Sequence, residues 1–244
     1  MRRYGLIGRH LSHSFSKEYF TRKFATEEIA AEYALYELSD IAELNALIES
    51  EESLCGLNVT IPYKESVLPY LDAMSEEARG VGAVNCIAIK GGRRKGYNTD
   101  IIGIEATLDR LNIAPNHRAI ILGTGGAAKA VEYVLRRRQI EYLAVSRSAE
   151  RGDTTYDNLS PDDIASHHLI INTTPLGMYP NVETLPQIDY AAITPQHSVF
   201  DLVYNPDPTL FMQRAAEQGA TVVGGKLMLY AQAEASWQIW NRQP

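Results

Sequence analysis

A glycine-rich turn between an apolar strand and a helix constrains this chain more than any other feature. Residues 123–128 read Gly-Thr-Gly-Gly-Ala-Ala, after the apolar run 120–122 and before a helical pattern. This is the context in which Gly-x-Gly-x-x-Ala acts as a dinucleotide-binding fingerprint. Gly123 permits the tight turn, Gly125 lets the backbone approach a pyrophosphate closely, and the small Ala128 lets the helix pack on the strand. The alternative is a βα turn without a ligand, and the position between strand and helix favours the nucleotide.

The next apolar run, residues 142–145, indicates which nucleotide binds. NAD sites usually carry an acidic residue at this strand end for the ribose 2′-hydroxyl, and none stands there. Arg147 and Arg151 flank short hydroxyl side chains instead, and guanidinium groups pair with the 2′-phosphate of NADP. The alternative is that both arginines are solvated surface residues that bind no ligand. Glu150 lies close by and is a weaker candidate for binding the ribose. The predicted cofactor is NADP(H), held by Gly123, Gly125, Gly126, Ala127, Ser146, Arg147, Ser148 and Arg151.

The order of apolar runs predicts two α/β domains. Runs at 119–122, 142–145, 169–172, 199–202 and 221–223, some separated by helical segments, follow the βαβ pattern of a parallel sheet. Earlier strands are predicted at 3–7, 33–38 and 57–61, with a hairpin of 84–89 and 94–97 about Gly91 and Gly92. Helices are predicted at 14–24, 41–48, 101–111, 127–138 and 227–240. We expect residues 1–101 plus 226–244 to form a substrate-binding domain, and 102–225 a Rossmann-type NADP-binding domain.

Composition excludes several classes of protein. Of the 244 residues 45% are hydrophobic and 22% charged, so the chain is neither disordered nor collagen-like nor a coiled coil. A formal net charge of −7 disfavours broad nucleic-acid binding. Cys55 and Cys86 make no disulfide framework, and no zinc-like spacing exists, so no metal is expected. The lack of an apolar leader or an 18-residue apolar run predicts a cytoplasmic protein without a membrane partner, either a monomer or a homodimer.

Hydroxyl and amide side chains gather in four segments of the first hundred residues. They are residues 12–16, which include Ser14 and Ser16, residues 58–64, residues 83–85 and residues 98–100. Helix capping and turn chemistry explain any one of these residues as well as a binding role does, since Ser14 and Asp100 both suit helix N-termini. As a group they suit a small polyhydroxylated molecule with a carboxylate.

Lys64 and Asp100 have a clear chemical use beside a nicotinamide. Hydride addition to a ketone leaves an alkoxide that needs a proton, and a desolvated lysine can supply it. A neighbouring carboxylate can orient that lysine and tune its pKa.

With these motifs assembled, the chain resembles the shikimate dehydrogenase family over nearly its full length. The similar segments are residues 5–8, the His13-Ser14-x-Ser16 motif, residues 56–64 (Gly-Leu-Asn-Val-Thr-Ile-Pro-Tyr-Lys), 82–85, 96–100, 123–128, 146–151, 172–178, 201–206 and 224–233. Lys17 stands where the family usually has Pro, and Tyr63 where His is common.

The resemblance implies a two-domain enzyme with its site in the cleft between the domains. It would reduce 3-dehydroshikimate to shikimate with NADPH. Lys64 and Asp100 would be the catalytic proton-transfer pair. Residues implied to hold the substrate are Ser14, Ser16, Asn58, Thr60, Asn85, Asp100, Tyr204 and Gln232; those implied to line the cofactor are Thr174, Met178, Val203 and Gly225.

Two alternatives stay open at this point. The first is a quinate/shikimate dehydrogenase relative that prefers NAD, which the missing acid after Val145 disfavours. The second is a non-catalytic nucleotide-binding regulator on the same fold, which has no need of a Lys–Asp pair.

Overall fold

The computed structural model describes residues 1–11, 14–113 and 117–242, so Ser12 and His13 of the serine segment lie outside the described residues. The chain divides into two compact units. The first unit is Met1–Thr99 with Ala233–Pro244, and the second unit is Asp100–Gln232. The second division falls inside one helix, α9 (Lys226–Asn241). The domain limits at 101/102 and 225/226 stay a prediction.

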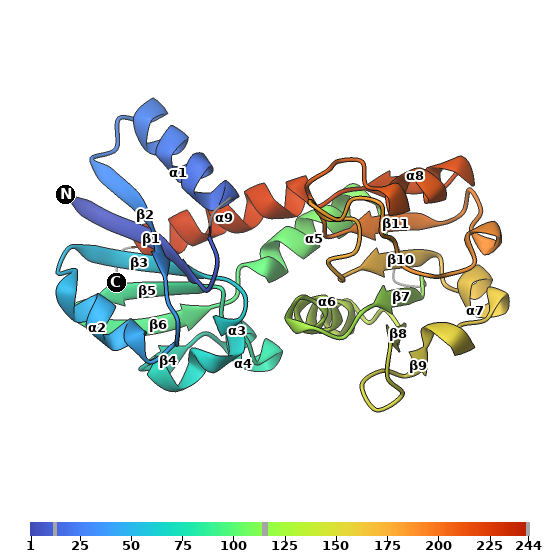
Figure 1. The fold of residues 1–244 in the computed structure, drawn as a ribbon, viewed down its shortest axis with the longest axis horizontal. Coiled ribbons are helices and arrows are strands. Elements are labelled where there is room, and N and C mark those ends of the chain that lie inside the picture. Colours follow the sequence, from blue (N-terminus) through green and yellow to red (C-terminus); the bar gives the residue numbers. More distant parts are fainter. Residues whose placement is uncertain (12–13, 114–116, 243–244) are drawn as a thin grey trace. The chain divides into compact units, whose positions relative to one another are not determined.

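A six-stranded mixed sheet organises the first unit (Figure 1). Its spatial order is β2-β1-β3-β5-β6-β4. β1 runs parallel to β2 and β3, whereas β5 runs antiparallel to both β3 and β6. The strands are β1 (Arg2–Gly8), β2 (Ala31–Glu37), β3 (Leu54–Val59), β4 (Ala73–Met74), β5 (Cys86–Lys90) and β6 (Arg93–Tyr97).

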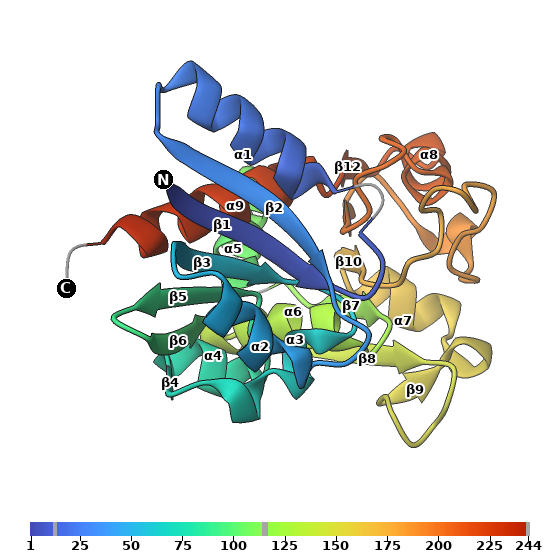
Figure 2. The ribbon, with the colours of Figure 1, turned by 60° about the vertical axis from the view of Figure 1, so that its left-hand side comes forward.

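Helices cover both faces of this sheet, which therefore has two apolar cores (Figure 2). One core lies under α2 and α3 and includes Leu44, Leu57 and Val67. The other lies under α1 and the last part of α9 and is rich in aromatic rings, with Phe20 and Trp240 at its centre. The helical segments are α1 (Phe15–Thr26), α2 (Glu43–Ser50), α3 (Tyr63–Ser66), η1 (Leu68–Tyr70) and α4 (Glu76–Val81).

Trp240 anchors the end of α9 in the first unit. Its ring stacks on Tyr4 at a centroid distance of 4.8 Å, and its indole N–H donates to the carbonyl of Ile87 at 3.0 Å. Gly56 in β3 lies under this indole, so that a Cβ at position 56 would collide with it. Trp240 is 4% exposed and therefore part of the core.

The second unit contains a parallel sheet in the order β12-β11-β10-β7-β8-β9. The strands are β7 (Ala119–Leu122), β8 (Tyr142–Ser146), β9 (Thr154–Thr155), β10 (Leu169–Asn172), β11 (Ser198–Asp201) and β12 (Thr221–Val223). The helical segments are α5 (Asp100–Arg110), α6 (Gly126–Arg137), η2 (Tyr156–Asn158), α7 (Pro161–Ser166), η3 (Tyr190–Ala192), α8 (Leu210–Glu217) and the start of α9. This α/β order with parallel strands confirms the predicted fold class.

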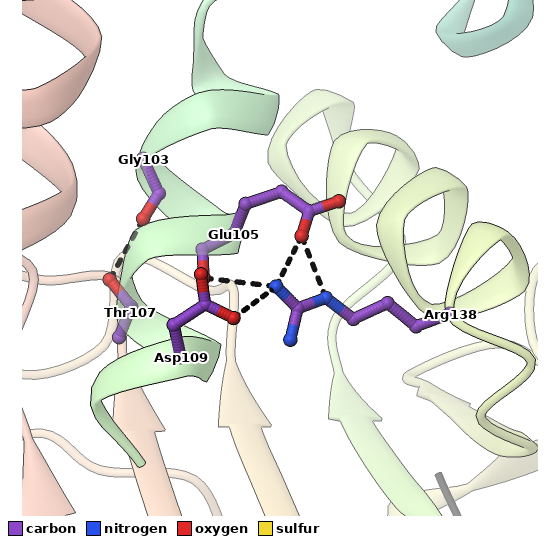
Figure 3. Close-up of polar contacts among 5 residues, drawn as sticks. All are labelled: Gly103, Glu105, Thr107, Asp109 and Arg138. Atoms are coloured by element: carbon purple, nitrogen blue, oxygen red, sulfur yellow. Dashed lines mark hydrogen bonds and ion pairs between the residues drawn. The ribbon is translucent and has the colours of Figure 1, made fainter. Parts of the chain in front are cut away.

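Helices lie on both faces of the second sheet as well. α7 and α8 cover one face, where Ile164 and Phe211 pack with Ile120 and Ile170. α5 and α6 lie side by side on the other (Figure 1). Arg138, just after α6, ties these two helices together, because its guanidinium donates to Glu105 at 2.7 Å and to Asp109 at 2.6 Å, both on α5 (Figure 3).

Three local predictions need correction. The strand predicted at 57–61 begins earlier, at Leu54, and ends at Val59, because the chain turns there and the amide of Tyr63 bonds back to the carbonyl of Thr60. The helix predicted at 41–48 begins at Glu43, after a turn in which Asp40 accepts from the amide of Ala42. Asp100 is the first residue of α5, not the residue before it.

No helix among the described residues is long and apolar enough to cross a bilayer. Cys55 and Cys86 are both free thiols, and Cys86 is buried.

Candidate active site

The predicted serine segment begins helix α1. Ser14 is its N-cap, with a side-chain oxygen that accepts from the amide of Lys17 at 3.3 Å. Ser16 lies in the first turn, and its hydroxyl forms a hydrogen bond with the phenol of Tyr33 on β2. Burial holds the pKa of Tyr33 well above its usual value, so the phenol stays protonated.

Asn58, the penultimate residue of β3, has both ends of its amide engaged. The phenol of Tyr33 donates to its Oδ1 at 2.8 Å. Its Nδ2 donates to the hydroxyl of Ser236 at 3.0 Å and to the carbonyl of Asn85 at 3.3 Å. Asn58 is 5% exposed, so these bonds replace the water that the amide loses on burial.

Asn85, directly before β5, forms the second half of the same network. Its Nδ2 donates to the hydroxyl of Thr99 at 3.0 Å, and its Oδ1 accepts from the amide of Thr99 at 2.6 Å. The hydroxyls of Thr99 and Ser236 lie 3.2 Å apart. The structure thus brings three predicted residues, Ser16, Asn58 and Asn85, into one chain of hydrogen bonds.

Thr99 belongs to the polar segment 98–100 found from the sequence, but it received no role there, and Ser236 was missed altogether. Ser236 follows Gln232 by one helical turn on α9. The i, i+4 spacing from Gln232 is the signal that could have found Ser236, because such residues share one face of a helix.

The remaining substrate and catalytic candidates fall in both units. In the first unit, Thr60 follows β3 directly and Lys64 is the second residue of α3, both partly buried. In the second unit, Asp100 is 7% exposed and Gln232 is 9% exposed. Tyr204 follows β11 and is half-buried, which raises the pKa of its phenol.

The glycine-rich turn joins β7 to α6 as predicted. Gly123 has φ +105°, and a Cβ there would meet the hydroxyl of Thr173 and the methyl of Thr174 at 2.8 Å. Gly125 is the N-cap of α6, with open space where its Cβ would be and no side-chain capping bond. The first amides of this twelve-residue helix are therefore suited to a phosphate. Gly126 and Ala127 form its first turn.

The predicted 2′-phosphate segment follows β8. Ser146 is buried, and its hydroxyl accepts from the amide of Ser148 at 3.3 Å and lies 3.4 Å from that of Thr124 in the glycine turn. The guanidinium groups of Arg147 and Arg151 are exposed, and no hydrogen bond or ion pair within the described residues occupies them. Two exposed guanidinium groups beside the glycine turn suit a phosphate ester, although the charge of Arg147 also acts on the phenol of Tyr156.

Asn172, Thr174 and Asp201 order the ends of two neighbouring strands. Asn172 Oδ1 accepts from the hydroxyl of Thr174 at 2.6 Å and from its amide at 3.0 Å, while its Nδ2 donates to Asp201 at 2.9 Å. The same carboxylate accepts from the amide of Val203 at 3.0 Å and the hydroxyl of Thr209 at 2.6 Å.

Asp201 carries the buried charge at this edge of the sheet. Burial raises the pKa of its carboxyl to about 6, although the three donors from Thr209, Val203 and Asn172 act to lower it. A partly protonated carboxyl near neutral pH follows from this balance.

Gly225 and Met178 differ in how tightly the fold holds them. The amide of Gly225 donates to the carbonyl of Val203 at 3.0 Å, and a Cβ at Gly225 would collide with the carbonyl of Leu202. Met178 is 42% exposed, so its thioether side chain is available to a ligand.

The residues present fit NADP(H). The glycine turn offers backbone amides and a cradle at Gly125 that a Cβ would fill, and the segment after β8 offers cationic groups with no acid at the strand end. Among the described residues, no cluster of His, Cys, Asp or Glu could hold a metal ion.

Comparison with known proteins gives consistent results. Residues 6–87 match the family model described as the shikimate dehydrogenase substrate binding domain. A curated shikimate dehydrogenase (NADP(+)) from Clostridium beijerinckii is 39% identical over 98% of this chain and 91% of its own.

Solved structures give the same family across both units. A chorismate mutase/shikimate 5-dehydrogenase fusion protein from Clostridium acetobutylicum matches with a TM-score of 0.87 at 36% identity, over 98% of this chain and 90% of that one. Shikimate 5-dehydrogenase from Thermus thermophilus, in complex with NADP(H) and shikimate, matches with a TM-score of 0.89 at 27% identity, over 99% and 94%.

Proposed function

Because the chain belongs to the shikimate dehydrogenase family, we propose that it is an NADP-dependent enzyme that interconverts 3-dehydroshikimate and shikimate. This reaction belongs to chorismate and aromatic amino-acid biosynthesis. The observation that carries the proposal is similarity to curated NADP-dependent relatives at 31–39% identity over 97–99% of the chain.

The substrate binds through groups that match its chemistry. Ser14 and Ser16 bind the carboxylate, while amides and hydroxyls such as Asn58, Asn85 and Thr60 bind the ring hydroxyls. Tyr204, Gln232 and Asp100 complete the set. The support for this assignment is the hydrogen-bonded network that includes Ser16, Asn58 and Asn85, which holds two of the amides in one orientation.

Lys64 and Asp100 handle the proton. When bound, NADPH supplies the hydride that reduces the carbonyl carbon of 3-dehydroshikimate. The carbonyl oxygen then becomes an alkoxide, and Lys64 donates the proton that turns it into the hydroxyl of shikimate. Asp100 orients the ammonium group. In the direction of shikimate oxidation the same pair accepts the proton.

The second unit holds the cofactor. The amides at the start of α6 bind the pyrophosphate after the turn at Gly123 and Gly125. Arg147 and Arg151, with Ser146 and Ser148, bind the 2′-phosphate. The side nearer the nicotinamide is lined by Thr174, Met178, Val203 and Gly225.

The test is nicotinamide absorbance with purified protein and four combinations: shikimate or quinate, each with NADP⁺ or NAD⁺. We expect fast reduction of NADP⁺ with shikimate and much slower reduction in the other three. Preference for NAD⁺ would contradict the role of the two arginines and leave the family unchanged. Normal NADPH binding without turnover of either acid would contradict the enzyme and favour a regulator.

The chain acts on small molecules, and three further properties stay predictions: a cytoplasmic location, the absence of nucleic-acid and membrane partners, and a monomeric or homodimeric state.

A further inference from the structure

We propose that Ser236, on helix α9, is a positioning residue that sets the orientation of the substrate-binding amides Asn58 and Asn85. This inference rests on the function proposed above, because it names a further determinant of the same substrate site. It concerns the first unit alone, since Ser236, Asn58, Asn85 and Thr99 all belong to it.

The location of Ser236 is the first argument. Its side chain is fully buried, at 0% exposure. Its hydroxyl lies 3.0 Å from Nδ2 of Asn58 and 3.2 Å from the hydroxyl of Thr99, which in turn bonds Asn85. Ser236 therefore joins the end of β3 to the segment after β6 through one hydroxyl group.

The assignment of protons is the second argument. The amide of Asn58 could in principle be turned by 180°, with its oxygen and nitrogen exchanged. The carbonyl of Asn85 lies 3.3 Å from Nδ2 and can only accept, so it fixes Nδ2 on its own side and leaves Oδ1 to accept from the phenol of Tyr33. Nδ2 must then face Ser236, whose oxygen accepts from it.

The second amide follows from the first. Oδ1 of Asn85 accepts from the backbone amide of Thr99 at 2.6 Å, which cannot act as an acceptor. Nδ2 of Asn85 must therefore donate to the hydroxyl of Thr99, which is coupled to that of Ser236. Both amides are thus held in the one orientation that presents a defined pattern of donors and acceptors.

A fixed orientation lowers the cost of binding. A ligand that recognises two buried amides loses affinity if each must first be turned or held, because ordering side chains opposes binding. Removal of the hydroxyl of Ser236 leaves Nδ2 of Asn58 with the longer bond to Asn85 O alone. The expected effect is on substrate binding, not on the proton or hydride steps.

The experiment compares Ser236→Ala with Thr107→Val as a matched control. Thr107, a residue of the second unit, is also 0% exposed, and its hydroxyl donates to the carbonyl of Gly103 one turn earlier in α5 (Figure 3). Both variants remove one buried, hydrogen-bonded hydroxyl. For each, KM for shikimate, KM for NADP⁺, kcat and the melting temperature are measured beside the wild type.

We expect Ser236→Ala to raise KM for shikimate by about tenfold, the size of one buried hydrogen bond. KM for NADP⁺ and kcat should change by less than about threefold, and Thr107→Val should leave all three constants near wild type. A folded Ser236→Ala variant with normal KM for shikimate would overturn the proposal. Equal changes in all three constants, or the same loss in Thr107→Val, would overturn it as well.

A second variant covers the case in which Ser236→Ala does not fold. Tyr33→Phe removes the bond at the opposite end of the same amide without altering Ser236. It should also raise KM for shikimate selectively, and an unchanged KM would overturn the proposal. If both variants fold, their effects on KM should be less than multiplicative, because they act on one amide. A wild type without shikimate turnover overturns the proposed function, and the inference with it.

Discussion

At the scale of single residues, the first unit satisfies the buried amides of Asn58 and Asn85 with partners from other elements. Asn58 and Ser236 are 178 positions apart in sequence and 3.0 Å apart in space. A buried amide without a partner costs about 1–3 kcal/mol, so the hydroxyl groups of Tyr33, Thr99 and Ser236 contribute to the stability of the proposed substrate site as well as to its shape.

Replacement of Lys64 by Ala should lower kcat by about 10²- to 10⁴-fold, the usual contribution of a general acid. Shikimate KM should change by less than about fivefold, because the serines and amides proposed to bind the substrate remain. Steady-state kinetics measure both constants. Lys95→Ala, an exposed lysine of β6, is the matched control. Turnover near wild type in the Lys64 variant would remove that residue from the mechanism.

Replacement of Arg147 by Ser should raise KM for NADP⁺ by about 10- to 100-fold, because one charge-assisted bond to the 2′-phosphate is lost. The weaker activity with NAD⁺, which lacks that phosphate, should hardly change. Arg137→Ser, an exposed arginine at the far end of α6, serves as the control. An equal loss with both cofactors would show that Arg147 acts on something other than the 2′-phosphate.

The raised pKa of Asp201 should be visible in the pH dependence of stability. Its carboxyl has a pKa of about 6 in the folded chain against 3.8 ordinarily, so the folded state binds the proton more tightly. Relative to Asp201→Asn, the wild-type free energy of unfolding should be greatest below pH 4 and fall as the pH rises through 6. The total fall should be about 3 kcal/mol.

Urea unfolding at pH 4, 5 and 7 checks this, followed by circular dichroism because both tryptophans belong to the first unit. A difference between the two proteins that stays constant with pH would contradict the shifted pKa.

Ser236 shows which site residues are difficult to find from the sequence alone. Asn58 and Asn85 stand in short polar motifs, so sequence alone selected them. Ser236 stands in a helix of ordinary composition. Its i, i+4 spacing from Gln232 places it on the same face of the helix, but its partners become apparent only once α9 packs on the first sheet.

At the scale of elements, the two glycines of the turn before α6 have different roles. Gly123 is needed for the fold of the turn, and Gly125 leaves room for the cofactor. Gly123→Ala places a Cβ at φ +105° and 2.8 Å from two threonine side-chain atoms, so we expect a loss of about 1–3 kcal/mol in stability. Gly125→Ala meets open space at an ordinary φ of −86°, so stability should hardly change. Its methyl group would instead occupy the approach to the pyrophosphate, and KM for NADP⁺ should rise about tenfold or more.

Melting temperatures and NADP⁺ titrations of the two variants provide the check. A Gly125 variant with normal cofactor affinity would contradict the cofactor role of Gly125. A Gly123 variant of wild-type stability would contradict the structural role of Gly123.

Element prediction succeeded where the periodicity is long or the turn chemistry strong. The hairpin about Gly91 and Gly92 and the parallel strands of the second unit are confirmed. Short elements such as α3 and α7 were not predicted, since four or six residues contain too little of a helical period. The end of β3 was placed two residues late because Thr60 and Ile61 continue an apolar-polar alternation, although the backbone turns there.

At the scale of the whole molecule, the first unit is made from two separate stretches of chain. Ala233, Ile239 and Trp240 belong to the same aromatic core as Tyr4, Phe20 and Tyr33. Removal of residues 233–244 should therefore unfold the first unit, since loss of a buried tryptophan alone costs about 3–5 kcal/mol. The second unit, which keeps its own sheet and helices, should still bind NADPH.

Limited proteolysis, with the fragments identified by mass spectrometry, reports which part of the truncated chain is protected, and NADPH fluorescence reports binding. A chain that stops after Asn241 keeps the whole of α9 and is the control. Protection of residues 1–99 in the shorter chain would contradict the shared core.

The split of α9 between the two units also sets an order of events during synthesis. A ribosome completes Met1–Thr99, then the whole of Asp100–Gln232, and only afterwards the residues that fill the first core. The domain made first is thus the one that finishes folding last. Until the last part of α9 emerges, α1 alone covers the aromatic face of the first sheet, and the space that Trp240 fills in the folded protein stays open.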